Sequence, residues 1–599
     1  MRDNPPMAGT ASSFKAHLQH PLERWLPIAG WLRRYTREDF HGDLTAGIVT
    51  AILLVPQGMA FALLAGLPAQ IGLYVSILPP LIYALFGTSR TLAVGPVSVA
   101  AIMVAHALSD LPAGTDPLMA AVGLALLSGA ALLAMGVARM GVVANFLSHP
   151  VLSGFTTAAA ILIIANQLSP LTGIEWPENP AWQTLPSQLA QATADAPGAT
   201  VVIGLGAVGW LLFAGMPMAR ALQRAGVSQH RALIVTRAAP LLAVIAGVAV
   251  VSAGNLDTSA SVAVVGRIPH GLPSITIGPV PMSLLIDLLP AAFLIGLVGY
   301  VESVSIAKLL AGRHRQRIDA NQEMIALGAA NVAAGLSGGM PVAGGFSRTM
   351  VNYAAGARTQ LAAIITAALV GLVALFFTPA LASVPKAVLA AIIIVAVSRL
   401  VDLKGAAAVW RYDRVDGAVL GLTVAGVLGL GIEPGLAIGI IASLTSFVLR
   451  AARPHVAVLG RIRGSEHFRN IKRHEVQTWP HVLFLRVDEN LSFANASFLE
   501  TCLMTELATR AEVRHIVLVM SSVNAIDSTA LETLERAARS ACEAGATVHL
   551  SDVKGPVMDR LKLTGLLEAL APGRVFLSAH LAAEELGQRP TGISAPRSD

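Results

Sequence analysis

The sequence predicts an α-helical polytopic membrane protein with about fourteen spans in two inverted seven-span repeats, followed by a small cytoplasmic α/β domain. Three observations predict this fold class. Of the 599 residues, 54% are hydrophobic and 13% are charged, whereas a soluble protein of this length carries about 25% charged residues. The apolar residues gather in long runs, and the chain becomes more polar after Arg450.

These observations divide the chain into four predicted parts. Residues 1–40 form a cytoplasmic tail, 41–452 the membrane domain, 453–475 a basic linker and 476–590 the α/β domain. A span needs about 20 apolar residues, and several runs are shorter. The runs of the first half are Leu44–Leu64, Leu67–Phe86, Val94–Leu108, Met119–Met135, Leu147–Leu168, Val201–Met216 and Pro240–Ser252. Those of the second half are Leu284–Leu310, Met324–Leu336, Gly345–Tyr353, Leu361–Phe377, Ala387–Leu400, Ala418–Leu430 and Leu436–Leu449.

The basic residues predict the orientation of these spans. Lys and Arg concentrate in every second loop, and the loops between them are nearly free of both. The positive-inside rule then places both termini in the cytoplasm of a cell with a bacterial-type inner membrane. The tail shows no cleavable signal peptide, and a short amphipathic helix around Trp25 and Trp31 is expected to contact membrane lipid.

Gly and Pro interrupt the third run of each half. The first interruption is Val94-Gly95-Pro96-Val97-Ser98, and the second is Pro341-Val342-Ala343-Gly344-Gly345-Phe346-Ser347-Arg348. Each predicts an extended segment followed by a half-helix that starts inside the membrane. Two facing helix N-termini present unpaired N–H groups and positive dipole ends, which suit an anion. The predicted anion-binding residues here are Pro96, Val97, Ser98, Gly345, Phe346, Ser347, Arg348 and Thr349.

Arg348 and Glu302 lie well inside apolar runs, where an ion costs about 2.5–3.5 kcal/mol. Arg348 would add a positive charge to the anion site; alternatively, it snorkels or pairs with an acid. Glu302 lies in an environment of low dielectric constant, where a carboxyl group can take and release a proton near neutral pH. It is therefore the candidate proton carrier or counter-charge to Arg348. The alternative is a Glu near the cytoplasmic end of its span, hydrogen-bonded to its neighbours.

A polar and an aromatic residue share one face of the first span. Gln57 and Phe61 are four residues apart, so both point to the same side of a helix. Gln57 can donate a hydrogen bond to an oxyanion, and Phe61 can line the pocket. By itself, such a pair is more typical of core packing.

The C-terminal part has a different pattern. His481–Val487, His515–Met520 and Thr547–Leu550 are predicted to be short buried strands, separated by helices near Ser497–Arg510 and Ser528–Cys542. Strands that alternate with helices predict a small α/β domain, which is too polar to span a membrane.

Several functional classes are excluded. The sequence has no GxxxxGK[ST] phosphate-binding loop, so ATP-driven transport by this chain is not expected. No catalytic set emerges, which argues against an enzyme. Cys502 and Cys542 lack CxxC spacing, so neither a metal site nor a disulfide framework is predicted. No cofactor is expected. The basic residues are scattered through loops, which argues against nucleic-acid binding.

The motifs of the membrane domain resemble the SulP family of sulfate permeases. The resemblance rests on Pro56-Gln57-Gly58-Met59-Ala60-Phe61-Ala62-Leu63-Leu64-Ala65-Gly66-Leu67-Pro68, Gly87-Thr88-Ser89-Arg90, Val94-Gly95-Pro96 and Gly344-Gly345-Phe346-Ser347-Arg348-Thr349. It implies a core domain and a gate domain that move as an elevator, in a homodimer. It favours sulfate as substrate with protons as the coupling ion. Bicarbonate and dicarboxylates such as succinate remain alternatives, as does a passive anion channel of the same fold.

The C-terminal domain resembles STAS domains, which are related to anti-sigma-factor antagonists. Phe493-Ala494-Asn495-Ala496 and Ile526-Asp527-Ser528-Thr529-Ala530-Leu531 carry this match. The resemblance implies a regulatory phosphosite at Thr529 or Ser528, and a cytoplasmic protein partner. Ala530 stands where the antagonists have Gly. The alternative is that Asp527 or Ser528 simply caps the following helix.

Overall fold

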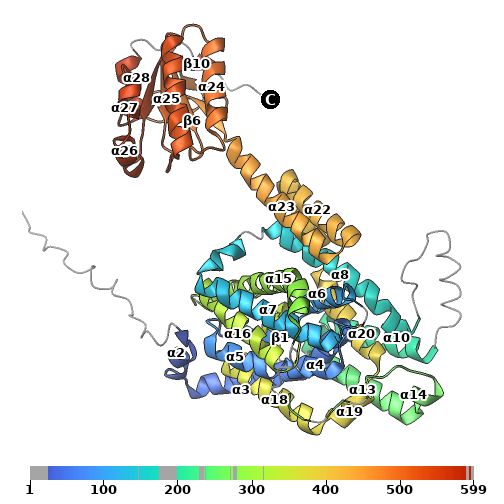
Figure 1. Cartoon of the computed structure of the whole chain (residues 1–599). Helices are drawn as coiled ribbons and strands as arrows, with labels where there is room; N and C mark the ends of the chain where they lie inside the picture. Colours follow the sequence, from blue (N-terminus) through green and yellow to red (C-terminus); the bar gives the residue numbers. More distant parts are fainter. Residues whose placement is uncertain are drawn as a thin grey trace, which may run out of the picture. The chain divides into compact units, whose positions relative to one another are not determined.

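The computed structural model describes residues 25–587 and 593–594, except for 113, 146–147, 175–197, 228–234, 237, 267, 270, 274–279 and 315. Most of the predicted N-terminal tail, the long loop after the fifth run and the last residues of the predicted α/β domain lie outside the described residues. The chain forms two compact units, Met1–Ser443 and Leu444–Asp599 (Figure 1).

The membrane unit begins with the short helix α2 (Ile28–Leu32), and the long capped helix α3 (Arg37–Leu64) follows. Thr36 and Asp39 form a reciprocal capping box at its start, which satisfies two N–H groups that lack intrahelical acceptors. The helix stops before Gly66, whose φ of +75° suits glycine. The following elements are α4 (Ala69–Tyr74), α5 (Leu78–Phe86), β1 (Val94–Gly95), α6 (Ser98–Ser109), α7 (Pro117–Val137), α8 (His149–Thr172), α10 (Gly198–Phe213), α11 (Met216–Arg224), α13 (Ala239–Gly254) and α14 (Leu256–Ser259).

The second half of the unit begins with α15 (Met282–His314). The helices after it cover the runs that the sequence predicts. These elements are α16 (Ala320–Leu336), β2 (Ala343–Gly344), α17 (Phe346–Ala354), α18 (Leu361–Phe376), α19 (Thr378–Ala382), α20 (Lys386–Val397), η2 (Ser398–Leu400), α21 (Leu403–Tyr412), α22 (Arg414–Leu430) and α23 (Ile432–Ala452).

Among the described residues, six helices are long and apolar enough to cross a membrane, and the bent pair α10–α11 adds a seventh if it counts as one span. The broken third runs and several shorter helices do not meet this length on their own, because a full span takes about 20 residues. The number of fourteen spans therefore stays a prediction.

The helices of the membrane unit pack in two groups. One group contains α3, α5, α7, α15, α16, α17 and α18; the other contains α8, α10, α13, α20 and α22. Glycines allow the closest approaches within the first group. A Cβ atom at Gly129 of α7 would lie 2.8 Å from the Gly328 carbonyl oxygen, and one at Gly328 of α16 would lie 2.9 Å from the Gly129 oxygen. Small residues at such crossings are typical of membrane helices.

The C-terminal unit is a mixed sheet flanked by helices, coloured orange to red in Figure 1. Its strand order is β10-β5-β3-β6-β7-β8-β9, with β6 to β9 parallel and β3 antiparallel to β6. Apolar side chains form one core on each face of the sheet. The elements are β3 (Val456–Arg461), β4 (Phe468–Asn470), β5 (Val476–Gln477), β6 (Val482–Val487), α24 (Ala496–Thr509), β7 (His515–Val519), α25 (Ser528–Glu543), β8 (Thr547–Ser551), α26 (Gly555–Leu561), α27 (Leu566–Ala569), β9 (Val575–Phe576), α28 (Ala579–Leu586) and β10 (Ile593–Ser594).

The three predicted strands and two predicted helices of this unit are present as β6, β7, β8, α24 and α25. The structure differs at 453–475, where the sequence predicts a linker. These residues include β3 and β4, which belong to the sheet. Ala457 and Leu459 of β3 are buried on one side, and this period of two is obscured in the sequence by the surrounding basic residues.

Two histidines form a buried pair on neighbouring strands of this sheet. His549 of β8 is 3% exposed, and its Nε2 lies 3.2 Å from Nδ1 of His515 on β7. The other ring nitrogen of His549 accepts a hydrogen bond from the Arg574 backbone N–H at 3.1 Å. Burial, and then repulsion by His515 and Arg574, lowers the pKa of His549 to about 4.

This pair predicts a loss of stability of the C-terminal unit in acid. Between the ordinary histidine pKa of about 6.5 and the folded pKa of about 4, the unfolded chain binds the extra proton. The free energy of unfolding is therefore highest above a pH of about 6.5. As the pH decreases from there to about 4, it falls by at most about 1.4 kcal/mol per pH unit. NMR titration of the imidazole and denaturant unfolding at pH 7 and 5 measure both quantities. His549→Gln should flatten the profile; an ordinary histidine titration near 6.5 would contradict the prediction.

Candidate anion-binding site

The two Gly- and Pro-rich interruptions meet in the structure. Strands β1 and β2 pair antiparallel, with Val94 opposite Gly344 and Gly95 opposite Ala343. Helices α6 and α17 begin directly after these strands. The structure therefore contains both predicted extended segments and both half-helices, and it brings them together from positions about 250 residues apart.

The N-termini of both half-helices lack side-chain caps. The first N–H groups of an α-helix have no intrahelical acceptor, and the helix dipole adds positive potential at the same end. Ser98 and Ser347, in the first turns of α6 and α17, are only partly buried, and Phe346 is 45% exposed. Backbone and hydroxyl donors are thus available here to an anion.

Arg348 connects the two half-helix segments. It is buried, and its Nη1 donates to the Pro96 carbonyl oxygen at 2.8 Å, while its Nη2 lies 3.4 Å from the Ala93 oxygen. A Cβ atom at Gly95 or Gly345 would lie 3.3 or 3.2 Å from Nη2. Glycine at both positions therefore leaves room for the guanidinium between the segments. Arg348 neither snorkels nor forms an ion pair within 4 Å among the described residues.

Glu302 lies close enough to Arg348 for their charges to interact. It belongs to α15, is partly buried, and makes no hydrogen bond or short ion pair in the part of the chain that the structure describes. Its neighbour Ser303 accepts a hydrogen bond from the Gly344 N–H at 2.8 Å. Among the described residues, Glu302 thus lacks the bonded neighbours that the alternative requires, and its helix α15 contacts β2.

Gln57 and Phe61 of the first span are both buried in α3, a helix that contacts α6 and α17. The Gln57 Oε1 atom is buried without a hydrogen-bond partner among the described residues. This atom is an acceptor, whereas an anion needs the donor end of the amide. The contact of Gln57 and Phe61 with the anion therefore stays a prediction.

Comparison with known proteins identifies the family of this chain. Residues 40–423 match the Sulfate permease family, and residues 473–582 match the STAS domain. The chain belongs to the Sulfate permease family. The permease is therefore a multi-pass membrane transporter rather than an enzyme, with a C-terminal STAS domain.

Relatives and solved structures extend over nearly the whole permease. It is 33% identical over 594 residues to "Sulfate transporter 4.1, chloroplastic" of Arabidopsis thaliana, covering 96% of this chain and 84% of that protein. It is 30% identical over 585 residues to "High affinity sulfate transporter 2" of Stylosanthes hamata, covering 95% and 87%. Its fold is similar to the inward-facing murine Solute Carrier 26 family member A9 anion transporter, with a TM-score of 0.84, 24% identity, and coverage of 98% and 97%.

Buried side chains that sequence reasoning missed hold β2 in place. The Asn331 amide of α16 accepts from the Val342 N–H at 2.9 Å and donates to the Val342 oxygen at 2.9 Å. It therefore replaces the strand partner that this segment lacks. Ser303 performs the same function for Gly344. A polar residue inside an apolar run was the available signal, but its partner could not be inferred from the run.

A second set of side chains holds the segment before β1. Asn352 donates to the Thr91 oxygen at 2.9 Å, and Gln360 donates to the oxygens of Ser89 and Leu92 at 2.6 and 3.1 Å. The Thr349 hydroxyl accepts from the Ala93 N–H at 3.1 Å and is fully buried. Thr349 thus supports the β1 segment, a role that differs from its predicted contact with the anion.

Glu323 of α16 holds the turn that leads into this segment. Its carboxylate is fully buried and accepts four hydrogen bonds: from Tyr83 OH at 2.7 Å, Thr88 N–H at 2.7 Å, Thr88 Oγ1 at 2.6 Å and Ser89 N–H at 2.9 Å. Each of these donors would lack an acceptor without this side chain. Glu323 is therefore a structural anchor between α16 and the turn after α5.

The STAS turn has the capping geometry that the sequence left as an alternative. Asp527 accepts from the Ala530 N–H at 2.8 Å and from the Phe493 N–H at 2.7 Å. Asp527 is thus the N-cap of α25. Ser528 and Thr529 are both exposed, and Ser528 lines a cavity of about 70 Å³.

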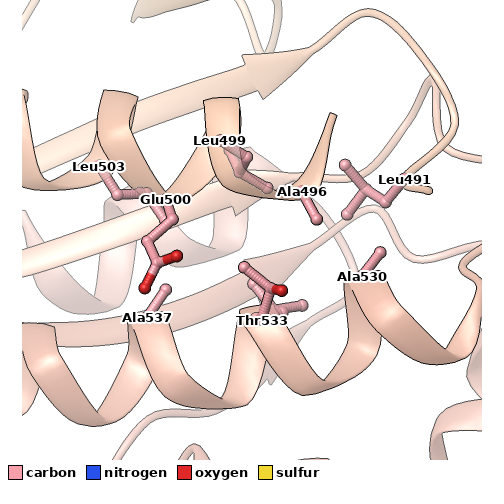
Figure 2. Close-up of a pocket in the computed structure, with 9 residues that line it drawn as sticks. Leu491, Ala496, Leu499, Glu500, Leu503, Ala530, Thr533 and Ala537 are labelled. Carbon is pink, nitrogen blue, oxygen red and sulfur yellow. The ribbon is translucent and has the colours of Figure 1, made fainter. Parts of the chain in front are cut away.

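A second, smaller hollow lies between α24 and α25 (Figure 2). It measures about 10 Å³ and is mostly apolar, which is the space of one water molecule. Figure 2 shows Glu500 and Thr533 on facing helices, and Arg536 bridges them by bonds to Glu500 at 3.1 Å and Thr533 at 3.3 Å. This hollow is a packing feature and has no room for a ligand.

Proposed function

We propose that the permease is a secondary active transporter that takes up sulfate together with protons. The observation that carries this proposal is the juxtaposition of two uncapped half-helix N-termini with Arg348. The alignments with this chain cover 84% and 87% of two relatives that are named sulfate transporters. These names support sulfate as the anion.

The proposed site binds a dianion through its positive potential. Each helix N-terminus supplies roughly half a positive charge, and Arg348 supplies a full one. Ser98 and Ser347 would donate hydroxyl hydrogens, Gln57 would donate its amide, and Phe61 would exclude water from one side. An anion that fills this site compensates the excess positive charge, which otherwise is costly in a membrane.

Glu302 is the proposed proton carrier. When protonated it carries no charge, so it leaves the positive potential of Arg348 available to the anion. When ionised, it competes with the anion for the same potential. Anion binding and protonation of Glu302 should therefore favour each other, which is the coupling that a proton symporter needs.

The two groups of helices support an elevator-type movement. Helices α3, α15 and α17 belong to the first group, and α6 contacts α3 and α15. The whole site can therefore move as one body against the second group. We propose that the permease works as a homodimer in a bacterial-type inner membrane with both termini in the cytoplasm. The exposed Ser528 and Thr529 are the proposed regulatory phosphosites, read by a cytoplasmic protein partner.

Uptake of labelled sulfate into proteoliposomes tests the proposal. The experiment compares vesicles with and without an inward proton gradient, and adds bicarbonate or succinate as competitor. Sulfate accumulation above the equilibrium level with the gradient is the expected result. Movement of bicarbonate or succinate without sulfate would overturn the substrate, and large currents without accumulation would indicate a channel.

Glu302→Gln tests the coupling. Wild-type uptake should rise as the external pH falls, whereas the variant, which is neutral at every pH, should lose most of this dependence. Exchange of internal for external sulfate needs no net proton movement and should be largely retained. Asp287→Asn is the matched control, because Asp287 is an exposed carboxylate on the same helix. An unaltered pH profile in Glu302→Gln would exclude Glu302 as the carrier.

A further inference from the structure

Helix α21 lies on the surface of the membrane unit without a single buried side chain. It packs on α22 and is preceded by η2. Leu403 is 69% exposed, Trp410 is 54% exposed and Tyr412 is 92% exposed. Large apolar side chains exposed together normally mark a binding surface.

The exposed residues of α21 are ordered by type around the helix axis. At about 100° per residue, Leu403, Ala407 and Trp410 fall on one stripe, and Lys404 and Arg411 fall on the stripe beside it. All five are exposed. The opposite side, with Gly405, Ala406 and Val409, is partly buried. An apolar stripe flanked by cations is typical of a helix that lies in a membrane interface.

Lys404 and Arg411 form no ion pair among the described residues. Asp402 and Asp413 lie at the two ends of the helix, outside the stripe of these cations, where they cap helix starts: Asp402 accepts from the Gly405 N–H at 2.8 Å, and Asp413 accepts from the Val415 N–H at 2.8 Å. The stripe itself is therefore positively charged, which favours an anionic partner.

We infer that α21 binds anionic lipid headgroups, with Lys404 and Arg411 at the phosphates and the Leu403–Ala407–Trp410 stripe at the level of the upper acyl chains. The inference rests on the membrane location of the unit and is independent of which anion is transported. Lipid binding by α21 would also affect the position of α22. The Trp410 ring lies against Gly417, where a Cβ atom would be 2.5 Å from the ring, so the position of α21 in the lipid fixes the start of that helix.

Fluorescence quenching tests this surface in the full chain. The permease is reconstituted with brominated-chain phosphatidylglycerol or brominated-chain phosphatidylcholine, and the Trp410 signal is the difference between the wild type and Trp410→Phe. Quenching at lower mole fractions of phosphatidylglycerol than of phosphatidylcholine is expected. Lys404→Gln/Arg411→Gln should weaken this preference by roughly 30-fold, because each cation near an anionic surface contributes about fivefold.

Lys472→Gln/Arg473→Gln is the matched control, since it removes two exposed charges from the C-terminal unit and should leave the preference unchanged. The single variants Lys404→Gln and Arg411→Gln should each lose about half of the effect on a logarithmic scale, and they replace the double variant if it does not fold. Equal quenching by the two lipids in the wild type overturns the inference. So does a double variant that keeps the lipid preference but loses dimerisation, because the surface would then bind a second copy of the chain.

Discussion

Replacing Arg348 with Ala should lower the affinity for the transported anion by about 100-fold. The variant loses the full positive charge between the two half-helices. It also loses the Nη1 bond to the Pro96 oxygen at 2.8 Å, which holds the two half-helix segments together at the site. Arg348→Lys should recover part of the affinity, because it restores the charge but cannot reproduce the two-pronged contact with Pro96 and Ala93. Binding of labelled sulfate to the purified protein measures both effects.

Arg348→Ala should also lower thermal stability, because it leaves a buried carbonyl without its donor. The stability readout and the binding readout can be separated by measuring affinity well below the unfolding temperature. Arg220→Gln is the control, since Arg220 is an exposed cation on α11 and should affect neither. Unchanged anion affinity in a folded Arg348→Ala protein would remove Arg348 from the site.

Glu323→Ala should destabilise the membrane unit by about 3–5 kcal/mol, because it leaves two buried backbone N–H groups and two hydroxyls without their acceptor. The expected result is a large drop in the unfolding temperature in detergent and in the yield of folded protein. Glu323→Gln should be less damaging, since its amide oxygen can still accept some of the four bonds.

The control for Glu323 is Glu38→Gln. Glu38 is 79% exposed and pairs with Arg358 at 2.9 Å on the surface, where an ion pair contributes little. Any Glu323→Ala protein that remains folded should keep a wild-type pH profile of uptake, which distinguishes this anchor from Glu302. A folded variant of normal stability would show that the turn after α5 needs no carboxylate.

The sequence predicts helices and strands well where the physical constraint depends only on residues that are neighbours along the chain. Apolar runs predict the membrane helices because the backbone of a span must satisfy its own hydrogen bonds. The Gly- and Pro-rich interruptions locate both half-helices, because these residues leave a segment extended before a helix can restart. In the STAS domain, the runs of β6 and β7 are recognisable because a central strand is largely apolar on both faces.

The missed residues are those whose role depends on a partner far along the chain. The partners of Glu323 and Gln360 lie about 235 and 271 residues away, and Asn331 binds Val342 across a turn of 11 residues. Strand β3 was assigned to a linker because its period of two is short and surrounded by Arg and His. Only the pairing with β6 distinguishes it from an irregular segment.

The sequence by itself determines a helical membrane protein with a polar α/β domain, and it determines where two helices are broken. These properties depend on local composition and period, which the bilayer and the protein core constrain in each element; the resemblance to sulfate permeases and STAS domains rests on the motifs instead. The tertiary structure decides that the breaks meet as β1 and β2, that Arg348 binds the carbonyls of the opposite segment, and that a buried carboxylate holds the turn beside it. Those contacts join distant parts of the chain, and a buried polar group is stable only where packing brings its partner within hydrogen-bonding distance.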